Sequence, residues 1–136
     1  LSNGRTASRK ELVVEIAKLQ HPDLMFGIPL YSDIASRHDF VVQAKGAFDE
    51  TIRGILNLKS YSQKVEIRVV LHKQTYERLP ELARFIARNF QFVDHVALMG
   101  LEITGFTRAN LDELWIDPLD YQDQLEEAVN NLMSSN

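Results

Sequence analysis

Apolar residues recur at the three- and four-residue spacing of an amphipathic helix in four stretches of the chain. These stretches are Leu12–Ala17, Phe48–Leu58, Leu79–Phe90 and Leu125–Met133. Ser8 and Glu11 have the spacing of a capping box ahead of the first helix. Asp117 and Pro118 predict the N-cap and the first helical residue of the last one. The pattern therefore predicts four helices, each with one face to bury.

Three short apolar runs bounded by turn residues lie between these helices and predict strands at Leu24 to Leu30, Val65 to Leu71 and His95 to Leu101. Strands that alternate with helices favour a parallel sheet with right-handed connections, so the expected fold class is α/β. Leu1 to Asn3 reads as the end of a further strand. Three strands and a stub leave a sheet edge unpaired, as in a slice of a TIM-type barrel, and such an edge can pair two copies in a dimer. In such a barrel ligands collect at the carboxyl ends of the strands.

Polar and apolar residues alternate along the middle predicted strand. Its polar face carries Glu66, Arg68, Val70 and His72, while Val65, Ile67, Val69 and Leu71 share the other face. If the sheet curves into a partial barrel, the polar face lines the lumen, where Arg68 can hold an anionic group. The competing interpretation is a structural ion pair between Glu66 and Arg68.

Composition narrows the function classes. The chain has 136 residues, 45% of them hydrophobic and 25% charged, as in one ordinary globular unit, so residues 1–136 are expected to form a single piece. A net charge of −4 without a basic stripe argues against nucleic-acid binding. No apolar run approaches the roughly 18 to 20 residues of a membrane span and no signal peptide is visible, so the expected compartment is the cytoplasm.

Candidate metal chemistry is sparse. Cysteine is absent, which excludes disulfides and thiolate ligands within this sequence. The four histidines lack the spacing of a metal site, so no metal is expected.

The loops hold further candidate residues. For His38 and Asp39 a loop-capping role is favoured over catalysis. The glycines of the Gly100–Gly105 loop fit either close approach of a ligand or a tight turn, and Trp115 is expected to anchor a long loop.

Several ordered motifs together resemble the later core of radical S-adenosylmethionine (SAM) enzymes. They are Leu1-Ser2-Asn3-Gly4-Arg5, His38-Asp39, the Gly-x-Phe-Asp-x-Thr-x-x-Gly-Ile stretch at Gly46–Ile55, Ile67–His72 and Met99-Gly100-Leu101-Glu102. Within that superfamily, residues 99–102 with Asn110, Trp115–Pro118 and Asp120-Tyr121 look most similar to the radical maturase of the His-Xaa-Ser peptide system. The resemblance covers nearly the whole chain.

The resemblance implies a C-terminal half of a radical SAM barrel. In the parent enzyme three cysteines upstream of Leu1 would hold a 4Fe-4S cluster that reductively cleaves SAM to a 5′-deoxyadenosyl radical, for modification of a ribosomally made peptide. The chain lacks an initiator methionine and is expected to be an inactive fragment that binds neither SAM nor the cluster by itself.

The resemblance also implies which residues face the cofactor. Ser2, beside Asn3, matches a hydroxyl residue near its methionyl or ribose part, and Met99, beside Gly100, matches a strand end whose backbone meets the adenine. Pro29 stands where many relatives have a ribose-binding serine, so Tyr31 or Ser32 would replace it. With Arg68, the candidate cofactor-binding residues are Ser2, Asn3, Ser32, Arg68, Met99 and Gly100.

Two other function classes stay open. One is a non-catalytic α/β module that binds a peptide or protein by strand addition at an exposed sheet edge. The other is a fragment of a non-radical barrel enzyme in which Glu66, His72 or Glu102 acts as general acid or base.

Overall fold

A computed structural model describes residues 2–134 of the chain, and these residues form two compact units. Unit 1 contains residues 2–69 and 92–97, and unit 2 contains residues 70–91 and 98–134. The division falls within the second and third strands, so each unit holds part of the sheet.

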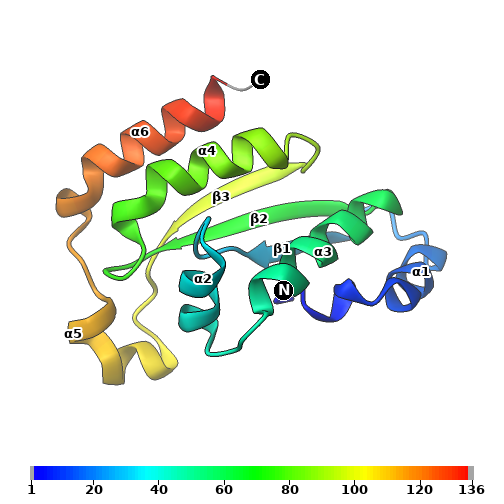
Figure 1. Cartoon of the computed structure of the whole chain (residues 1–136), viewed down its shortest axis with the longest axis horizontal. Coiled ribbons are helices and arrows are strands. Elements are labelled where there is room, and N and C mark those ends of the chain that lie inside the picture. Colours follow the sequence, from blue (N-terminus) through cyan, green and yellow to red (C-terminus); the bar gives the residue numbers. More distant parts are fainter. Residues whose placement is uncertain (1, 135–136) are drawn as a thin grey trace. The chain divides into compact units, whose positions relative to one another are not determined.

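Within the described residues three strands form one parallel sheet (Figure 1). They are β1 (Met25–Pro29), β2 (Lys64–Leu71) and β3 (His95–Gly100), in the order β1-β2-β3. β1 pairs with β2 in parallel, with Ile28 opposite Ile67. The α/β prediction is confirmed, and each strand matches its predicted run to within one residue at either end.

The predicted stub before β1 is not a regular strand. Ser2 and Asn3 have no strand assignment, and Leu1 lies outside the described residues. The backbone N–H of Ser2 nevertheless donates a hydrogen bond of 3.3 Å to the carbonyl oxygen of Gly27. The chain therefore lies beside β1 at this point without forming a ladder.

Unit 1 holds the first four helical segments: η1 (Thr6–Ser8), α1 (Lys10–Lys18), α2 (Ala35–Val42) and α3 (Ala47–Ser60). The predicted capping box of α1 is wrong, because the residue at the N-cap is Arg9 and no side chain of the described chain caps this end. Only Val13 of the predicted apolar stripe is fully buried.

The helix α2 has no counterpart among the elements that the sequence predicts. Its sequence has almost no amphipathic pattern, and Phe40 is 63% exposed. Periodicity, which depends on one apolar face, gives no signal for such a helix.

In unit 1 the start of the chain packs tightly against α3. Gly54 faces the backbone of Gly4, and a Cβ at position 54 would lie 2.1 Å from the Gly4 carbonyl oxygen. The Asn57 side chain donates hydrogen bonds of 2.9 and 3.0 Å to the carbonyl oxygens of Ala7 and Ser8. A glycine and an asparagine one turn apart on α3 thus hold η1 in place.

Unit 2 holds the other helical segments. They are η2 (Tyr76–Arg78), α4 (Leu79–Asn89), η3 (Gly105–Asn110), α5 (Leu111–Leu114), η4 (Pro118–Tyr121) and α6 (Gln122–Met133). The predicted α4 is confirmed, with Pro80 in its first turn. α4 and α6 lie side by side (Figure 1), joined by an Arg84–Glu127 ion pair of 2.8 Å.

The last helix differs from its prediction in two respects. Asp117 does act as a cap, accepting a hydrogen bond of 3.0 Å from the Leu119 N–H, but the turn that follows is a 3-10 helix and α6 begins only at Gln122. Its predicted buried stripe is confirmed in part, since Ala128 is buried and Leu125 and Leu132 are half-buried, whereas Val129 and Met133 are 38% and 70% exposed.

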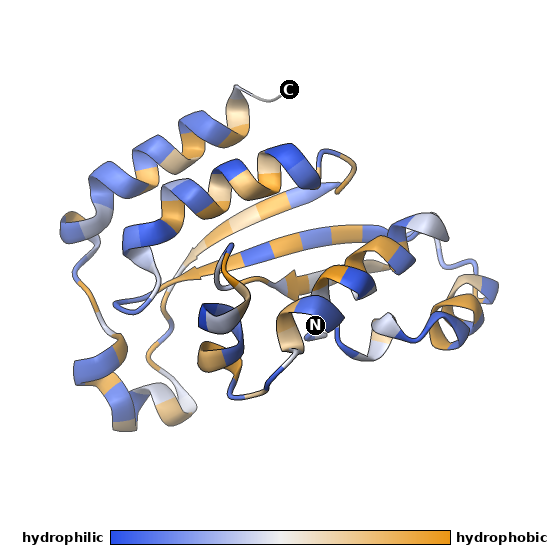
Figure 2. Cartoon of the chain, viewed as in Figure 1, coloured by the Kyte–Doolittle hydropathy of each residue, from blue (hydrophilic) through white to orange (hydrophobic). Residues whose placement is uncertain are grey.

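The middle strand shows the predicted alternation clearly (Figure 2). Val65, Ile67, Val69 and Leu71 are all buried, and the residues between them are at most half-buried. Within residues 2–134, none of the helices is both long enough and apolar enough to cross a membrane.

Candidate functional site

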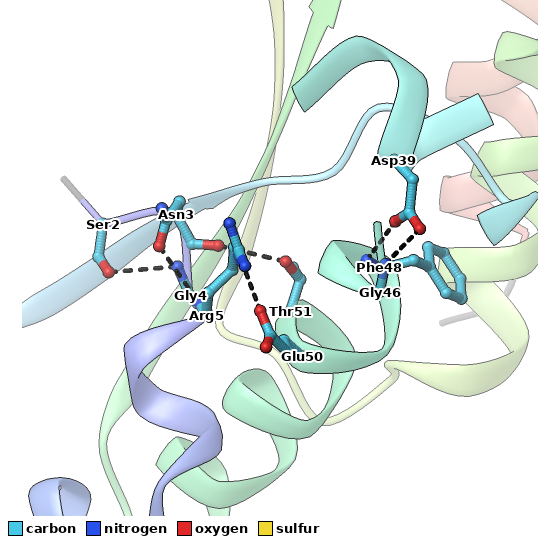
Figure 3. A network of polar contacts seen from close by, with 9 residues as sticks. All are labelled: Ser2, Asn3, Gly4, Arg5, Asp39, Gly46, Phe48, Glu50 and Thr51. Carbon is cyan, nitrogen blue, oxygen red and sulfur yellow. Dashed lines mark hydrogen bonds and ion pairs between the residues drawn. The ribbon is translucent and has the colours of Figure 1, made fainter. Parts of the chain in front are cut away.

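The first candidate residues lie in the turn at the start of the chain (Figure 3). The Ser2 hydroxyl oxygen accepts a hydrogen bond of 3.2 Å from the Gly4 N–H, and the Asn3 Oδ1 accepts one of 3.2 Å from the Arg5 N–H. The Asn3 carbonyl oxygen accepts a third bond, 3.2 Å long, from the Thr51 hydroxyl on α3. The turn is therefore bonded both to itself and to α3.

A glycine is required in this turn. Gly4 has φ +76°, in the left-handed region that favours glycine, and a Cβ there would lie 2.8 Å from Cγ2 of Ile28 on β1. The turn is thereby pressed against β1 and α3 at once. Ser2 and Asn3 accept through oxygen, which leaves the Ser2 O–H and the Asn3 Nδ2 hydrogens as donors for an outside ligand.

Ser32 lies beyond the carboxyl end of β1, where the resemblance to radical SAM enzymes implies a ribose contact. It is buried, its oxygen accepts a hydrogen bond of 3.1 Å from the Ile34 N–H, and its hydroxyl donates one of 3.4 Å to the Asp33 carboxylate. These bonds build the turn that leads into α2. A ribose hydroxyl would have to replace one of them, so Ser32 fits that contact less well than Ser2 does.

His38 is a buried side chain of α2. Its Nδ1 accepts a hydrogen bond of 3.3 Å from the Tyr31 N–H, and its ring packs against the rings of Tyr31 and Phe48, with centroids 5.8 and 5.7 Å away. Burial lowers the pKa of His38, and the nearby Asp39 carboxylate only partly opposes this shift. The ring is therefore neutral near pH 7, with its proton on Nε2.

Asp39 joins α2 to the start of α3 (Figure 3). Its two carboxylate oxygens accept hydrogen bonds of 2.6 Å from the Gly46 N–H and 2.8 Å from the Phe48 N–H. The Phe48 bond, and after it the Gly46 bond, holds the pKa of Asp39 below its usual value. The loop-capping interpretation is confirmed for Asp39.

Arg68 lies on the polar face of β2, as the alternation predicted. Glu66 forms an ion pair with the Arg68 Nε, and its other oxygen lies 2.6 Å from Nδ1 of His95 on β3. The hydrogen bond from Arg68, and then that from His95, lowers the pKa of Glu66, so this carboxyl is ionised at neutral pH. The structural ion pair is confirmed, and the anion-binding role of Arg68 stays a prediction.

Gly27 and His95 contact the Glu66–Arg68 pair, and the sequence did not predict either contact. A Cβ at Gly27 on β1 would lie 2.7 Å from the Arg68 Nε, so the guanidinium group lies over this glycine. His95 pairs with Glu66 across neighbouring strands. A glycine inside an apolar strand run is a signal of close approach, but only the strand register tells which side chain approaches it.

Met99 and Gly100 belong to unit 2, whereas the other four candidate residues belong to unit 1. Met99 is half-buried and Gly100 is exposed at the end of β3. A Cβ at Gly100 or Gly105 would meet nothing within 4 Å among the described residues, and Gly105 has φ +54°. Gly105 is therefore a turn glycine, and among the described residues a side chain at position 100 would point into open space.

His72, just after β2, is a polar group of unit 2 that the sequence singled out. It is buried, and burial lowers its pKa. Its carbonyl oxygen accepts hydrogen bonds from the Thr75 N–H and hydroxyl, 2.9 and 3.2 Å long, so it forms part of a closed turn. Trp115, expected to anchor a loop, is instead 44% exposed.

Comparison with known proteins assigns neither a family nor a function, since the chain matches no protein-family model and no curated protein. Among residues 2–134, no three His, Asp or Glu side chains are grouped so as to hold a metal ion. The functional argument therefore depends on the contacts of the chain itself.

Proposed function

We propose that this chain is part of the barrel wall of a cytoplasmic radical SAM enzyme that modifies a ribosomally made peptide. The observation that carries the proposal is the hydrogen bond of 3.3 Å from the Ser2 N–H to the Gly27 carbonyl oxygen. β1 pairs with β2 along one edge, so Ser2 lies at its other edge. A strand ending at the Ser-Asn-Gly turn would then be the neighbour of β1, as consecutive strands are in a βα barrel.

The alternation of β2 also supports this proposal. The apolar residues of β2 lie on the same face of the sheet as Ile28, which contacts Gly4 on the side of α3. Glu66 and Arg68 lie on the opposite face. In a barrel the face opposite the helices is the lumen. A partly exposed Arg68 is suited to balance an anionic group there, in competition with Glu66.

The residues of the Ser2–Gly4 turn fit a role in binding SAM, which when bound to the cluster supplies the radical chemistry. The Ser2 hydroxyl and the Asn3 side-chain amide can donate hydrogen bonds to carboxylate or ribose oxygens. Their own oxygens are engaged by the Gly4 and Arg5 N–H groups, which fixes both side chains in orientation. In this proposal these residues bind and orient the cofactor.

The residues of this chain do not fit the 4Fe-4S cluster. Such clusters are held by cysteine thiolates, and the sequence has no cysteine. The proposal therefore requires cluster ligands from sequence outside these 136 residues, and the chain alone should be inactive.

The test uses the gene product that contains this sequence, reconstituted with iron and sulfide without oxygen and then assayed for 5′-deoxyadenosine from SAM. We expect product from that protein and none from the 136-residue chain. Ser2→Ala should raise the KM for SAM about three- to tenfold, as expected when one hydrogen bond to the cofactor is lost. Ser36→Ala, which changes an exposed serine on α2, is the matched control. A correctly folded parent that forms no cluster and no product would overturn the proposal.

A binding module is the second candidate, and one observation favours it. β3 is the last strand in the order β1-β2-β3, so within residues 2–134 its outer edge has no partner strand. An extended peptide, or a second copy of the chain, can add to such an edge through backbone hydrogen bonds. This candidate gains support if the parent protein forms no cluster and the chain is a dimer in solution.

A further inference from the structure

Unit 2 contains a surface pocket of about 560 Å³ that none of the cofactor candidates lines. It lies between the turn after β2, which contributes Lys73 and Tyr76, and the segment from α5 to η4, which contributes Asp112, Trp115, Asp117 and Asp120. In open α/β sheets ligands bind beyond the carboxyl ends of the strands, and Lys73 follows the end of β2 by two residues. The volume is in the range of small-ligand pockets.

The aromatic wall of the pocket is fixed through its backbone. The Trp115 N–H donates a hydrogen bond of 2.8 Å to the Leu111 carbonyl oxygen, and the Lys73 N–H donates one of 2.8 Å to that of Leu114. The residue before Trp115 is thus tied to the turn after β2. The Trp115 side chain stays 44% exposed, although exposing a large aromatic ring to water is unfavourable. A half-exposed indole on a backbone held in this way is a surface on which a flat group can stack.

The charge of the pocket is negative. Three carboxylates and one ammonium group line it. Within residues 2–134, the side chains of Asp112 and Asp120 make no hydrogen bond or ion pair, whereas Asp117 caps η4. The Lys73 Nζ donates a hydrogen bond of 2.9 Å to the Asp112 carbonyl oxygen, so it is tied to the backbone and forms no ion pair with the carboxylates. Two carboxylates beside an exposed indole are therefore open to an outside cation.

We propose that this pocket binds the side chain of an arginine residue in a peptide. A planar guanidinium group can stack on Trp115 and donate hydrogen bonds to Asp112 and Asp120 at the same time. A lysine ammonium group, a point charge without a flat face, can make only part of this arrangement. This inference does not depend on radical chemistry and holds for the chain by itself.

The test uses the 136-residue chain and tripeptides of the form acetyl-Gly-Arg-Gly-amide, with Gln, Lys or Glu in place of Arg. Trp115 is the only tryptophan, so indole fluorescence and the indole N–H resonance report on this pocket directly. The arginine peptide should shift both signals with half-saturation on the order of 1 mM, as expected for a single side chain. Half-saturation with the glutamine peptide should need roughly tenfold more.

The carboxylates are tested by the double variant Asp112→Asn with Asp120→Asn, which should weaken arginine binding about three- to tenfold. Asp123→Asn, at an exposed position in the first turn of α6, is the matched control and should leave binding unchanged. Equal binding of the glutamine and arginine peptides, tighter binding of the glutamate peptide, or full affinity of a folded double variant would each overturn the proposal.

Discussion

The carboxylate of Asp39 on α2 accepts a hydrogen bond of 2.8 Å from the backbone N–H of Phe48 on α3, nine residues further along the chain. Its other oxygen accepts one of 2.6 Å from Gly46, the N-cap residue of α3. A glycine N-cap has no side chain to satisfy the N–H groups at a helix start, so Asp39 does this from the preceding helix. One carboxylate therefore fixes both the start of α3 and its connection to α2.

Replacing Asp39 should lower stability through loss of this cap. We expect Asp39→Ala to lower the Tm by several degrees and Asp39→Asn to lower it less, because an amide oxygen can still accept one of the two bonds. The pKa of Asp39 is lowered in the folded state, so its stabilisation is present above the unfolded pKa of about 4 and is lost as the pH falls through the folded pKa. Thermal unfolding followed by circular dichroism should show the variants converging with wild type in acid. Asp23→Ala, at an exposed loop position, is the control.

Gly54→Ala should destabilise the protein, although alanine normally stabilises a helix by about 1 kcal/mol relative to glycine. The added Cβ would lie 2.1 Å from the Gly4 carbonyl oxygen, a backbone atom that cannot rotate away. We expect a loss of about 2 to 4 kcal/mol in the free energy of unfolding, measured by urea titration. Arg53→Ala, at the exposed neighbouring position of α3, should change it by less than about 0.5 kcal/mol. A Gly54→Ala variant as stable as wild type would show that η1 does not pack as described.

The sequence predicted well those elements whose pattern of buried and exposed residues lies within the element itself. β2 alternates strictly between buried and half-buried residues, and α4 buries an unbroken apolar stripe, so periodicity identified both. The Glu66–Arg68 pair followed from the same alternation, because residues two apart share a face of a strand.

What the sequence did not predict depends on contacts between distant segments. A glycine is needed at position 54 because the Gly4 backbone lies against it, and at position 27 because the Arg68 side chain does. Neither contact can be derived without the strand register and the helix packing. α2 has almost no amphipathic pattern and α5 has only four residues, so periodicity gave no signal for either helix. The position of Trp115 likewise depends on a contact between distant segments, since the Lys73 N–H donates a hydrogen bond to the carbonyl oxygen of the preceding residue, Leu114.

The close approach of Arg68 to Gly27 predicts an energetic coupling between these positions. Gly27→Ala should cost about 1 kcal/mol, because the Cβ displaces a flexible guanidinium group and weakens its pairing with Glu66. In an Arg68→Ala background the same substitution should cost little, since the space over position 27 is then open. A double-mutant cycle by urea unfolding measures this coupling, expected at about 0.5 to 1 kcal/mol. Additive costs would contradict the contact.

The buried ring of His38 predicts a loss of stability in mild acid. Burial lowers the pKa of His38 in the folded state, so the unfolded chain takes up a proton more readily. The stabilisation is therefore complete above the unfolded pKa of about 6.5 and is lost as the pH falls below it. Protonation would also remove the acceptor of the Tyr31 N–H bond.

His38→Asn tests this directly, because asparagine keeps an oxygen acceptor but cannot be protonated in this range. We expect the variant to be less stable than wild type at pH 7.5, through lost contacts with Tyr31 and Phe48, yet to lose less stability than wild type between pH 7.5 and 5.5. Part of the slope should remain, because burial lowers the pKa of His72 as well. His21→Asn, at an exposed loop position, is the control for the substitution itself. If His38→Asn and wild type lose stability in parallel as the pH falls, His38 is not the buried neutral ring that its contacts imply.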